Sequence, residues 1–332
     1  MAISLRLLHF RHERILAIRF ETETIEPSGG CSRVISTTIK AGVLEVSFVE
    51  YGPPDGWPCI MGHGFPYDVH AYAEAAPILA DAGARVIVPY LRGYGPTHFL
   101  SPDTPRSGEQ AALGADLLAL MDALKIGRAV VGGYDWGGRA ACIVSALWPE
   151  RIVALVSGNS YNIHDIARSW EPAPAAQEAA LWYQYYFHSE RGRRGLFKNR
   201  RDIARQLWRM WSPNWGFDEA TFERTAPSFD NPDFVEVVIH SYRQRYGLVP
   251  GDPAYAHIET RLTAQPPISV PAITIDGDAD GINFGTAHHA KHFIGPHEHR
   301  IFAGAGHNLP QERPADWARA VLDARAMAGV GP

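Results

Sequence analysis

The chain has 332 residues, of which 46% are hydrophobic, and a formal net charge of −5 at pH 7. This length can bury a large core and suits one α/β domain with an insertion. The charge gives no electrostatic reason to expect a nucleic-acid partner. Three widely spaced cysteines, Cys31, Cys59 and Cys142, favour free thiols in a reducing compartment. We therefore expect a cytoplasmic protein without stable membrane insertion.

Residues 1–32 are the segment whose structure the sequence leaves open. Charged residues such as Arg6 and Arg11 interrupt its apolar residues, which excludes a membrane-spanning helix and fits a signal peptide poorly. An added helix, a dimer arm and a disordered tail are all compatible with this pattern, so a homodimer stays open. Gly29 and Gly30 mark the expected end of the segment.

Apolar runs along the rest of the chain predict the strands of a sheet. Besides the strand before residue 133, strands are expected at about 33–40, 43–51, Pro58–Gly62, Arg85–Pro89, Ile152–Ser157, Val270–Ile275 and His299–Ala303. Helices are expected near 107–124 and from about Pro314 to Met327. This alternation predicts an α/β fold with a mostly parallel, eight-stranded sheet and helices on both faces. Functional groups in such a fold lie at the carboxyl ends of the strands.

The strand that ends at Gly62 is followed by His-Gly-Phe-Pro at residues 63–66. In folds with a nucleophile elbow, the loop after this strand supplies one backbone N–H to an oxyanion hole, and Phe65 is the expected donor. A histidine at such a strand end more often makes structural hydrogen bonds than acts as a base. We therefore expect His63 to have a structural role. The peptide bond before Pro66 can be cis.

Residues 133–137 read Gly-Tyr-Asp-Trp-Gly and form the most informative motif of the chain. An apolar run at 129–131 leads in and a helix-like run at 138–144 leads out. This is the context of the Gly-x-Ser-x-Gly nucleophile elbow, with Asp135 in the serine position. A carboxylate there attacks a saturated carbon that carries a leaving group, and water then hydrolyses the alkyl ester. Trp136 is the expected second oxyanion donor. The alternative is an ordinary loop whose Asp caps the next helix.

Residues 162–265 interrupt the alternation of strands and helices and predict a helical insertion with Pro and Gly breaks. The insertion divides the α/β core into residues 33–161 and 266–332. Sixteen of the 36 aromatic residues of the chain fall between Trp170 and Tyr246. Most of them are expected to pack the insertion, because a lid over the core needs a core of its own.

Polar residues after the last two strands complete a possible catalytic set. The strand at 270–275 runs into Asp276, Asp278 and Asp280, and the final strand ends shortly before His307. The order of nucleophile, acid and histidine is that of hydrolases with a nucleophile elbow. Asp280 lies farthest past its strand, where a loop can bring it beside His307, and is preferred to Asp278. Asp276 belongs to the strand end or caps a turn.

Four motifs taken together resemble those of the α/β-hydrolase-fold epoxide hydrolases, and the match extends from about residue 33 to about residue 325. They are His-Gly-Phe-Pro at 63–66, Arg-Gly-Tyr-Gly at 92–95, Gly-Tyr-Asp-Trp-Gly-Gly at 133–138 and Gly-His at 306–307. The resemblance implies a detoxifying enzyme that opens epoxides to vicinal diols through an alkyl ester on Asp135. Water activated by His307 and Asp280 would hydrolyse that ester.

The same resemblance implies two lid tyrosines that hold the epoxide oxygen and protonate it as the ring opens. A Tyr-Gln-x-Tyr-Phe stretch maps the first to Tyr183, and a Ser-Tyr-Arg stretch maps the second to Tyr242; Tyr185 and Tyr246 are their nearest rivals. A phenol suits this role because it is still protonated at neutral pH. Further candidates for the substrate pocket are His63, Pro66, Trp182, Tyr185 and Tyr246.

Two alternatives to an epoxide hydrolase are kept. Haloalkane dehalogenases share the Asp-Trp-Gly elbow, but their pattern commonly has Asn where this chain has Phe65. Arg139 lies where fluoroacetate dehalogenases carry an arginine that clamps the substrate carboxylate, although Trp136 replaces the second arginine of that clamp. We expect Arg139 to form a structural ion pair instead. A dehalogenase is the first alternative, and a non-catalytic binding protein is the second.

No cofactor or metal is expected. His288, His289 and His292, followed by two more histidines, have the look of a metal cluster, but no Glu or Cys at ligand spacing accompanies them. No Gly-x-Gly-x-x-Gly motif follows a strand, which argues against a dinucleotide. The expected partners are a small epoxide and water.

Overall fold

The computed structural model describes residues 35–330, so the predictions for residues 1–32 and Cys31 lie outside the described part. Its strands are β1 (Ile35–Ala41), β2 (Leu44–Tyr51), β3 (Trp57–Gly62), β4 (Ala84–Pro89), β5 (His98–Phe99), β6 (Ala129–Gly133), β7 (Ile152–Gly158), β8 (Ala272–Gly277) and β9 (His297–Phe302). Its helices are α1 (Ala75–Asp81), α2 (Gln110–Ala123), α3 (Asp135–Leu147), α4 (Ala175–Ala180), α5 (Trp182–His188), α6 (Glu190–Trp211), α7 (Glu219–Thr225), α8 (Phe234–Gln244), α9 (Ala256–Leu262), α10 (Leu309–Glu312) and α11 (Pro314–Met327).

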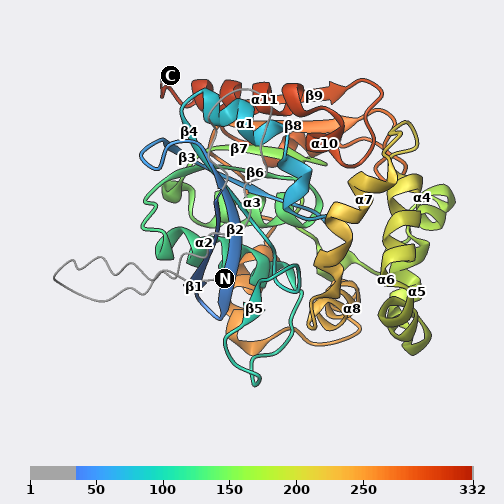
Figure 1. The fold of residues 1–332 in the computed structure, drawn as a ribbon. Coiled ribbons are helices and arrows are strands. Elements are labelled where there is room, and N and C mark those ends of the chain that lie inside the picture. The colour runs from blue at the N-terminus through green and yellow to red at the C-terminus, as the bar shows by residue number, and fades with distance from the viewer. Residues whose placement is uncertain (1–34, 331–332) are drawn as a thin grey trace.

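The strands form one mostly parallel sheet (Figure 1). Their order is β1-β2-β4-β3-β6-β7-β8-β9. In this order β1 pairs antiparallel with β2 and β2 with β4, and all strands from β4 onward are parallel to one another. The ninth strand is the two-residue β5, which pairs with β2 and which the apolar pattern did not predict. All five residues of β6 are buried, as expected for a central strand covered on both faces.

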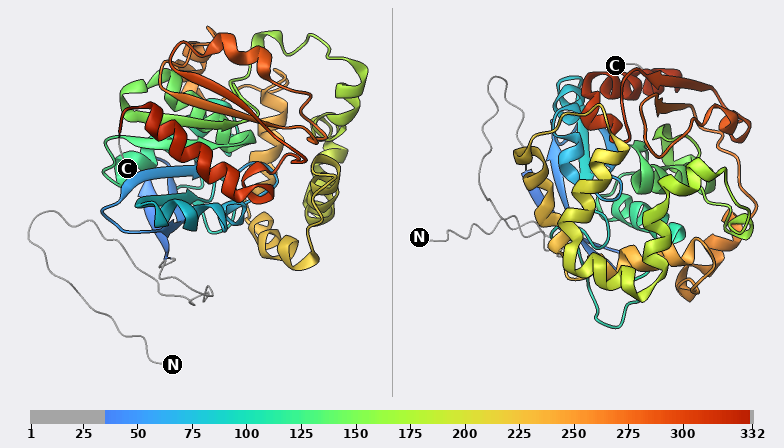
Figure 2. Two further views of the ribbon diagram at one scale, coloured as in Figure 1. Left: turned by 90° about the horizontal axis from the view of Figure 1, so that it is seen from above. Right: turned by 90° about the vertical axis from the view of Figure 1, so that its right-hand side faces the viewer.

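Helices cover both faces of the sheet (Figures 1 and 2). The helices α1 and α11 pack together on one face, and α2 and α3 pack together on the other. On the first face Trp317 of α11 is fully buried against Tyr72. On the second face Gly114 of α2 lets the helix approach Ile143 of α3, where an added Cβ would clash. This packing fixes the ends of β3 and β6, which carry the predicted site.

The helices α4–α9 form an inserted segment between β7 and β8 (Figure 1). All of them fall within residues 162–265, although the division of the chain into domains stays a prediction. The long helix α6 buries Leu196, Ala204, Leu207, Trp208 and Trp211. Trp208 Nε1 donates a hydrogen bond of 2.8 Å to the carbonyl of Pro66, which ties the insertion to the loop after β3. In the described part of the chain, no helix combines the length and apolar character that crossing a membrane requires.

Candidate active site

Asp135 lies at a sharp turn between β6 and α3. Its φ of 49° is a left-handed conformation that residues other than glycine seldom adopt. The turn is also tightly packed, because a Cβ on Gly137 would collide with the carbonyl of Gly62. The residue before α3 is Tyr134, and no side chain caps the helix, so a capping role for Asp135 finds no support. The turn has the strain and close packing of a nucleophile elbow.

The loop after β3 contacts the Asp135 carboxylate directly. The Phe65 N–H donates a hydrogen bond of 2.7 Å to Asp135 Oδ1, and the Phe65–Pro66 peptide bond is cis. A Cβ on Gly64 would lie 2.7 Å from the Asp135 Cβ, so glycine permits this approach. Burial by itself would raise the pKa of Asp135, but His307, Arg139 and the Phe65 N–H lower it below its ordinary value. Asp135 is therefore a carboxylate at neutral pH.

His307 connects Asp135 to a second carboxylate. Its Nδ1 lies 2.8 Å from Asp280 Oδ2, and its Nε2 lies 3.9 Å from Asp135 Oδ2 without a hydrogen-bond partner among the described residues. Burial works against a charged His307 ring, but Asp280 and Asp135 outweigh it and raise its pKa to about 10. The resting site therefore holds one imidazolium between two carboxylates.

Asp280 is the acid that the fold brings to the histidine. Its side chain is fully shielded from solvent, and its Oδ1 accepts the N–H groups of Ile282 and Asn283 at 2.9 and 3.1 Å. Asp278, which is exposed, instead accepts the Gly304 N–H at 2.5 Å. The preference for Asp280 over Asp278 therefore agrees with the geometry.

Asp276 has a structural position, as expected. Its Oδ2 accepts the Thr286 N–H at 2.6 Å. Its Oδ1 accepts the Thr286 hydroxyl at 2.7 Å and the Asn283 side-chain amide at 3.0 Å. These bonds tie the turn after β8 together. Asp276 lies within ion-pair distance of His299 rather than of His307.

Tyr183 of α5 and Tyr242 of α8 lie together above the elbow. Their ring centroids are 5.2 Å apart, and the Phe65 ring contacts both. Both phenols are buried, and burial together with Asp135 raises the pKa of each above its ordinary value. The Tyr242 hydroxyl has no hydrogen-bond partner in the described part of the chain. The site thus presents two protonated phenols on the side of Asp135 that faces the insertion.

Gln184 orients the Tyr183 hydroxyl. Its Nε2 donates to the Tyr183 oxygen at 2.8 Å, and its Oε1 accepts the Tyr246 hydroxyl at 3.0 Å. Tyr183 therefore accepts through its oxygen and keeps its own proton free to donate. Tyr246 is thus linked to Tyr183 through Gln184.

The remaining predicted pocket residues make other contacts. Tyr185 is 40% exposed and its hydroxyl bonds to Glu178, so the structure does not bring it to the site. Trp182 is half-buried and contacts Tyr183 edge to face at 6.4 Å. His63 is fully buried: its Nε2 accepts the Leu91 N–H, its Nδ1 faces the carbonyl of Gly64, and burial lowers its pKa to about 4.

The structure differs from the expectation of an ion pair for Arg139. No carboxylate in the described part of the chain pairs with this side chain, whose Nε instead donates to the carbonyl of Asn162 at 3.1 Å. Arg139 is nevertheless only 5% exposed. Burial and the nearby Arg245 lower its pKa to about 9, which leaves it charged at neutral pH.

Three supporting residues were missed by the sequence analysis. Asn159 Nδ2 donates to Asp280 Oδ2 at 3.1 Å, and Ser212 Oγ accepts the His307 N–H at 3.0 Å. Glu312 in turn accepts the Ser212 hydroxyl at 2.6 Å. Asn159 had a usable signal, because it directly follows β7, whose carboxyl end lies beside that of β8. Ser212 is distant in sequence from His307, and Glu312 belongs to no motif, so neither residue had a signal in the sequence.

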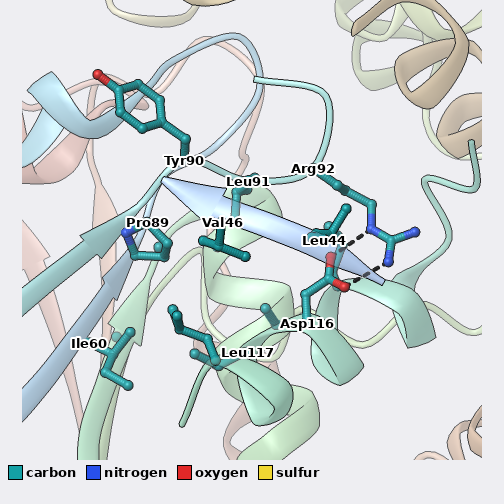
Figure 3. A pocket seen from close by; sticks show the side chains of 15 residues that line it. Leu44, Val46, Ile60, Pro89, Tyr90, Leu91, Arg92, Asp116 and Leu117 are labelled. Carbon is teal, nitrogen blue, oxygen red and sulfur yellow. Dashed lines mark hydrogen bonds and ion pairs between the residues drawn. The ribbon is translucent and has the colours of Figure 1, made fainter. Parts of the chain in front are cut away.

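A separate cavity lies between the sheet and α2 (Figure 3). It spans about 460 Å³ of empty space, part of which is open to solvent, and is lined mainly by aliphatic side chains, among them Leu44, Val46 and Leu117. Its charged groups, Arg92 and Asp116, pair with each other at 2.6 and 2.7 Å. None of the predicted catalytic residues lines it.

The histidines near residue 290 do not gather metal ligands. A short 3-10 helix, Ala287–His292, contains His288, His289 and His292. The ring centroids of His288 and His289 are 4.3 Å apart. Among residues 35–330, no group of three His, Cys, Asp or Glu side chains could hold a metal ion.

Comparison with known proteins places the chain in a family. The family model of the alpha/beta hydrolase fold matches residues 58–314, and the chain belongs to this family. Within it, the chain is a homologue of epoxide hydrolases. Epoxide hydrolase A of Mycobacterium tuberculosis is 28% identical over 309 residues, which cover 84% of this chain and 94% of that protein.

Two further relatives bear on the choice of substrate. The crystal structure of a "putative epoxide hydrolase" from Klebsiella pneumoniae is 47% identical, with a TM-score of 0.86, and the match covers 88% of this chain and 97% of that one. A haloalkane dehalogenase from Psychrobacter cryohalolentis is 29% identical over 137 residues, covering 39% of this chain and 44% of that protein. The first match covers most of both chains, and the second covers less than half of either chain.

Proposed function

We propose that the protein hydrolyses epoxides to vicinal diols through a covalent ester on Asp135. The observation that carries this proposal is the pair of buried phenols, Tyr183 and Tyr242, above a carboxylate in an elbow turn. An epoxide oxygen leaves as an alkoxide, which is a poor leaving group unless an acid protonates it, whereas a halide needs no proton. The similarity to epoxide hydrolases over nearly the whole chain supports the same substrate class.

In the first step, Asp135 Oδ2 attacks one carbon of the ring. Oδ1 is engaged by the Phe65 N–H, so Oδ2, which faces His307, is the free nucleophile. The C–O bond of the epoxide breaks as the C–O bond of the ester forms, and a phenol of Tyr183 or Tyr242 gives its proton to the alkoxide. His307 then supplies a proton to the phenolate.

Ester formation prepares His307 for the second step. The Asp135 carboxylate becomes a neutral ester, which removes one of the two negative charges that raise the pKa of His307. After it loses its proton, His307 accepts one from water, and the hydroxide adds to the ester carbon. The Phe65 and Trp136 N–H groups would stabilise the oxyanion that develops at Oδ1. Collapse of this intermediate releases the diol and restores the Asp135 carboxylate.

The proposal is tested by the substrate and by the phenols together. Tyr183→Phe and Tyr242→Phe should each slow diol formation from styrene oxide by about 10–1,000-fold, because one of two donors to the developing oxyanion is lost. Tyr185→Phe is the matched control, since its hydroxyl bonds to Glu178 on the surface, and it should keep near-normal rates.

The same variants separate epoxide hydrolysis from dehalogenation. The haloalkane dehalogenase relative and the unpaired Arg139 keep a carbon–halogen substrate as the second candidate. We expect no halide release from 1-bromobutane or fluoroacetate. Halide release without diol formation would contradict the proposal, and turnover of neither class would favour a binding protein.

The choice of acid is tested by a pair of Asp→Asn variants. Asp280→Asn should slow hydrolysis of the ester by up to about 10⁴-fold, because the amide cannot stabilise the imidazolium and favours the wrong tautomer of His307. Asp278→Asn should leave the rate unchanged. For both variants, the measurements are the steady-state rate of diol formation and the accumulation of the ester. Loss of activity in Asp278→Asn alone would mean that the acid is misassigned.

A further inference from the structure

Two buried arginines line one cavity beside the site, and neither forms an ion pair within the described part of the chain. Arg139 comes from α3 and Arg245 directly follows α8, and they are 5% and 7% exposed. The cavity between them is small: it spans about 180 Å³ of empty space, part of which is open to solvent. Two unpaired guanidinium groups with little access to water are costly unless an anion accompanies them.

Most donors of these arginines remain free in the described part of the chain. Arg139 uses only its Nε, and its two terminal nitrogens make no hydrogen bond. Arg245 bonds only within its own helix, to the carbonyl and the hydroxyl of Ser241 at 3.3 and 3.0 Å. The neighbouring carboxylate of Glu259 is already engaged by Gln110 Nε2 and the Ala111 N–H, and it pairs with neither arginine.

Neutral donors complete the lining of the cavity. The Gln244 amide and the His164 ring both line it, and neither side chain forms a hydrogen bond within residues 35–330. Burial and the two arginines lower the pKa of His164, so its ring is uncharged at neutral pH. The cavity thus gathers positive charge and hydrogen-bond donors, and none of the described residues that line it is acidic.

We propose that this cavity binds a small anion, held between Arg139 and Arg245. A cavity of this size has room for about one small ion such as a halide. Planar guanidinium groups also suit a single carboxylate group that reaches in from the substrate. The bound anion has two candidate sources: a free ion, or an acidic group on the substrate. Arg139 lies one helical turn from Asp135, and Arg245 stacks on the Tyr242 ring at 4.2 Å, so either occupant would adjoin the reacting groups.

The experiment measures binding without turnover, so its failure is distinct from a failure of the proposed hydrolysis. The unfolding temperature is recorded against bromide or acetate, with ionic strength held constant by a bulky sulfonate. A ligand that binds only the folded protein raises this temperature with its concentration. Arg139→Gln and Arg245→Gln should each weaken anion binding by at least about 10-fold, the cost of one charge-assisted hydrogen bond. Arg194→Gln, whose side chain is 80% exposed, is the control and should behave as the wild type.

Crystals of the wild-type protein soaked in bromide localise the ion, which keeps the test valid if a variant fails to fold. We expect an anomalous peak between Arg139 and Arg245. No temperature shift with any anion would overturn the proposal. A peak without a shift would mean an adventitious ion only, and would overturn it as well.

Two matched substrates then distinguish the sources. Glycidate carries a carboxylate beside its epoxide, and its methyl ester carries none. If the substrate supplies the anion, Arg245→Gln should raise KM about 10-fold or more for glycidate but not for the ester, and bromide should compete with glycidate. If a free ion is bound, bromide should not compete with either substrate, and the variant should treat the two alike.

Discussion

Asp135→Asn should lower turnover of an epoxide by at least about 10⁴-fold while the protein stays folded, because an amide cannot replace the carboxylate that forms the ester. Asparagine is the better first variant. Asp135 has a φ of 49°, which asparagine tolerates and alanine does not, so Asp135→Ala adds backbone strain of about 1–2 kcal/mol. Circular dichroism and thermal unfolding should match the wild type for Asp135→Asn and show a modest loss of stability for Asp135→Ala.

The origin of the product oxygen gives a second, independent measurement. In a single turnover in ¹⁸O-water, with enzyme in excess, the new hydroxyl of the diol should carry ¹⁶O from Asp135. The label should appear in the Asp135 carboxylate and reach the product only in later turnovers. Label in the diol at the first turnover would mean that water attacks the ring directly. Near-normal activity of Asp135→Asn would remove the basis of the proposed mechanism.

The elbow and the fold could be predicted because their signals are local. Asp135 stands between glycines, with a buried strand before it and a helix after it, and this pattern fixes the turn through packing that only glycine allows. The strands differ from prediction mainly at their ends: β8 begins and ends two residues later than expected, and β9 begins two residues earlier. The extra strand β5 has only two residues, too few for a hydrophobic period.

The parts that were missed depend on contacts between distant segments. Nothing in the sequence near Arg139 shows that the insertion would bring Arg245 beside it instead of a carboxylate. Ser212 lies at the end of α6, about 95 residues before His307, yet accepts its backbone N–H. Gln184 stands inside the motif used to find Tyr183, but its effect on the phenol proton appears only when Tyr246 is placed. Tertiary packing decides these roles, and one sequence does not encode them in a readable pattern.

His307→Gln should stop the reaction after the ester forms, and steady-state diol formation should fall by about 10²–10⁴-fold, the contribution of a general base. Glutamine is chosen because it can still bond to Asp280. Asp280 retains its bonds to Asn159 and to the backbone at Ile282, so the variant should fold. Because Asp135 remains free to attack, one equivalent of epoxide should disappear in a burst, with no diol released.

Intact-protein mass spectrometry identifies the trapped species. The mass of His307→Gln should rise by that of one whole epoxide molecule, because ring opening expels nothing, whereas an alkyl halide would add its mass less that of the hydrogen halide. Adding Asp135→Asn should abolish the adduct, and His98→Gln, a half-exposed histidine paired with Glu45, should turn over normally. Absence of any burst would mean that the imidazolium is already needed for ring opening. That outcome would fit the pKa of about 10, because a charged His307 lies 3.9 Å from Asp135 before the ester forms. The first role of His307 would then be that of a proton donor rather than a base.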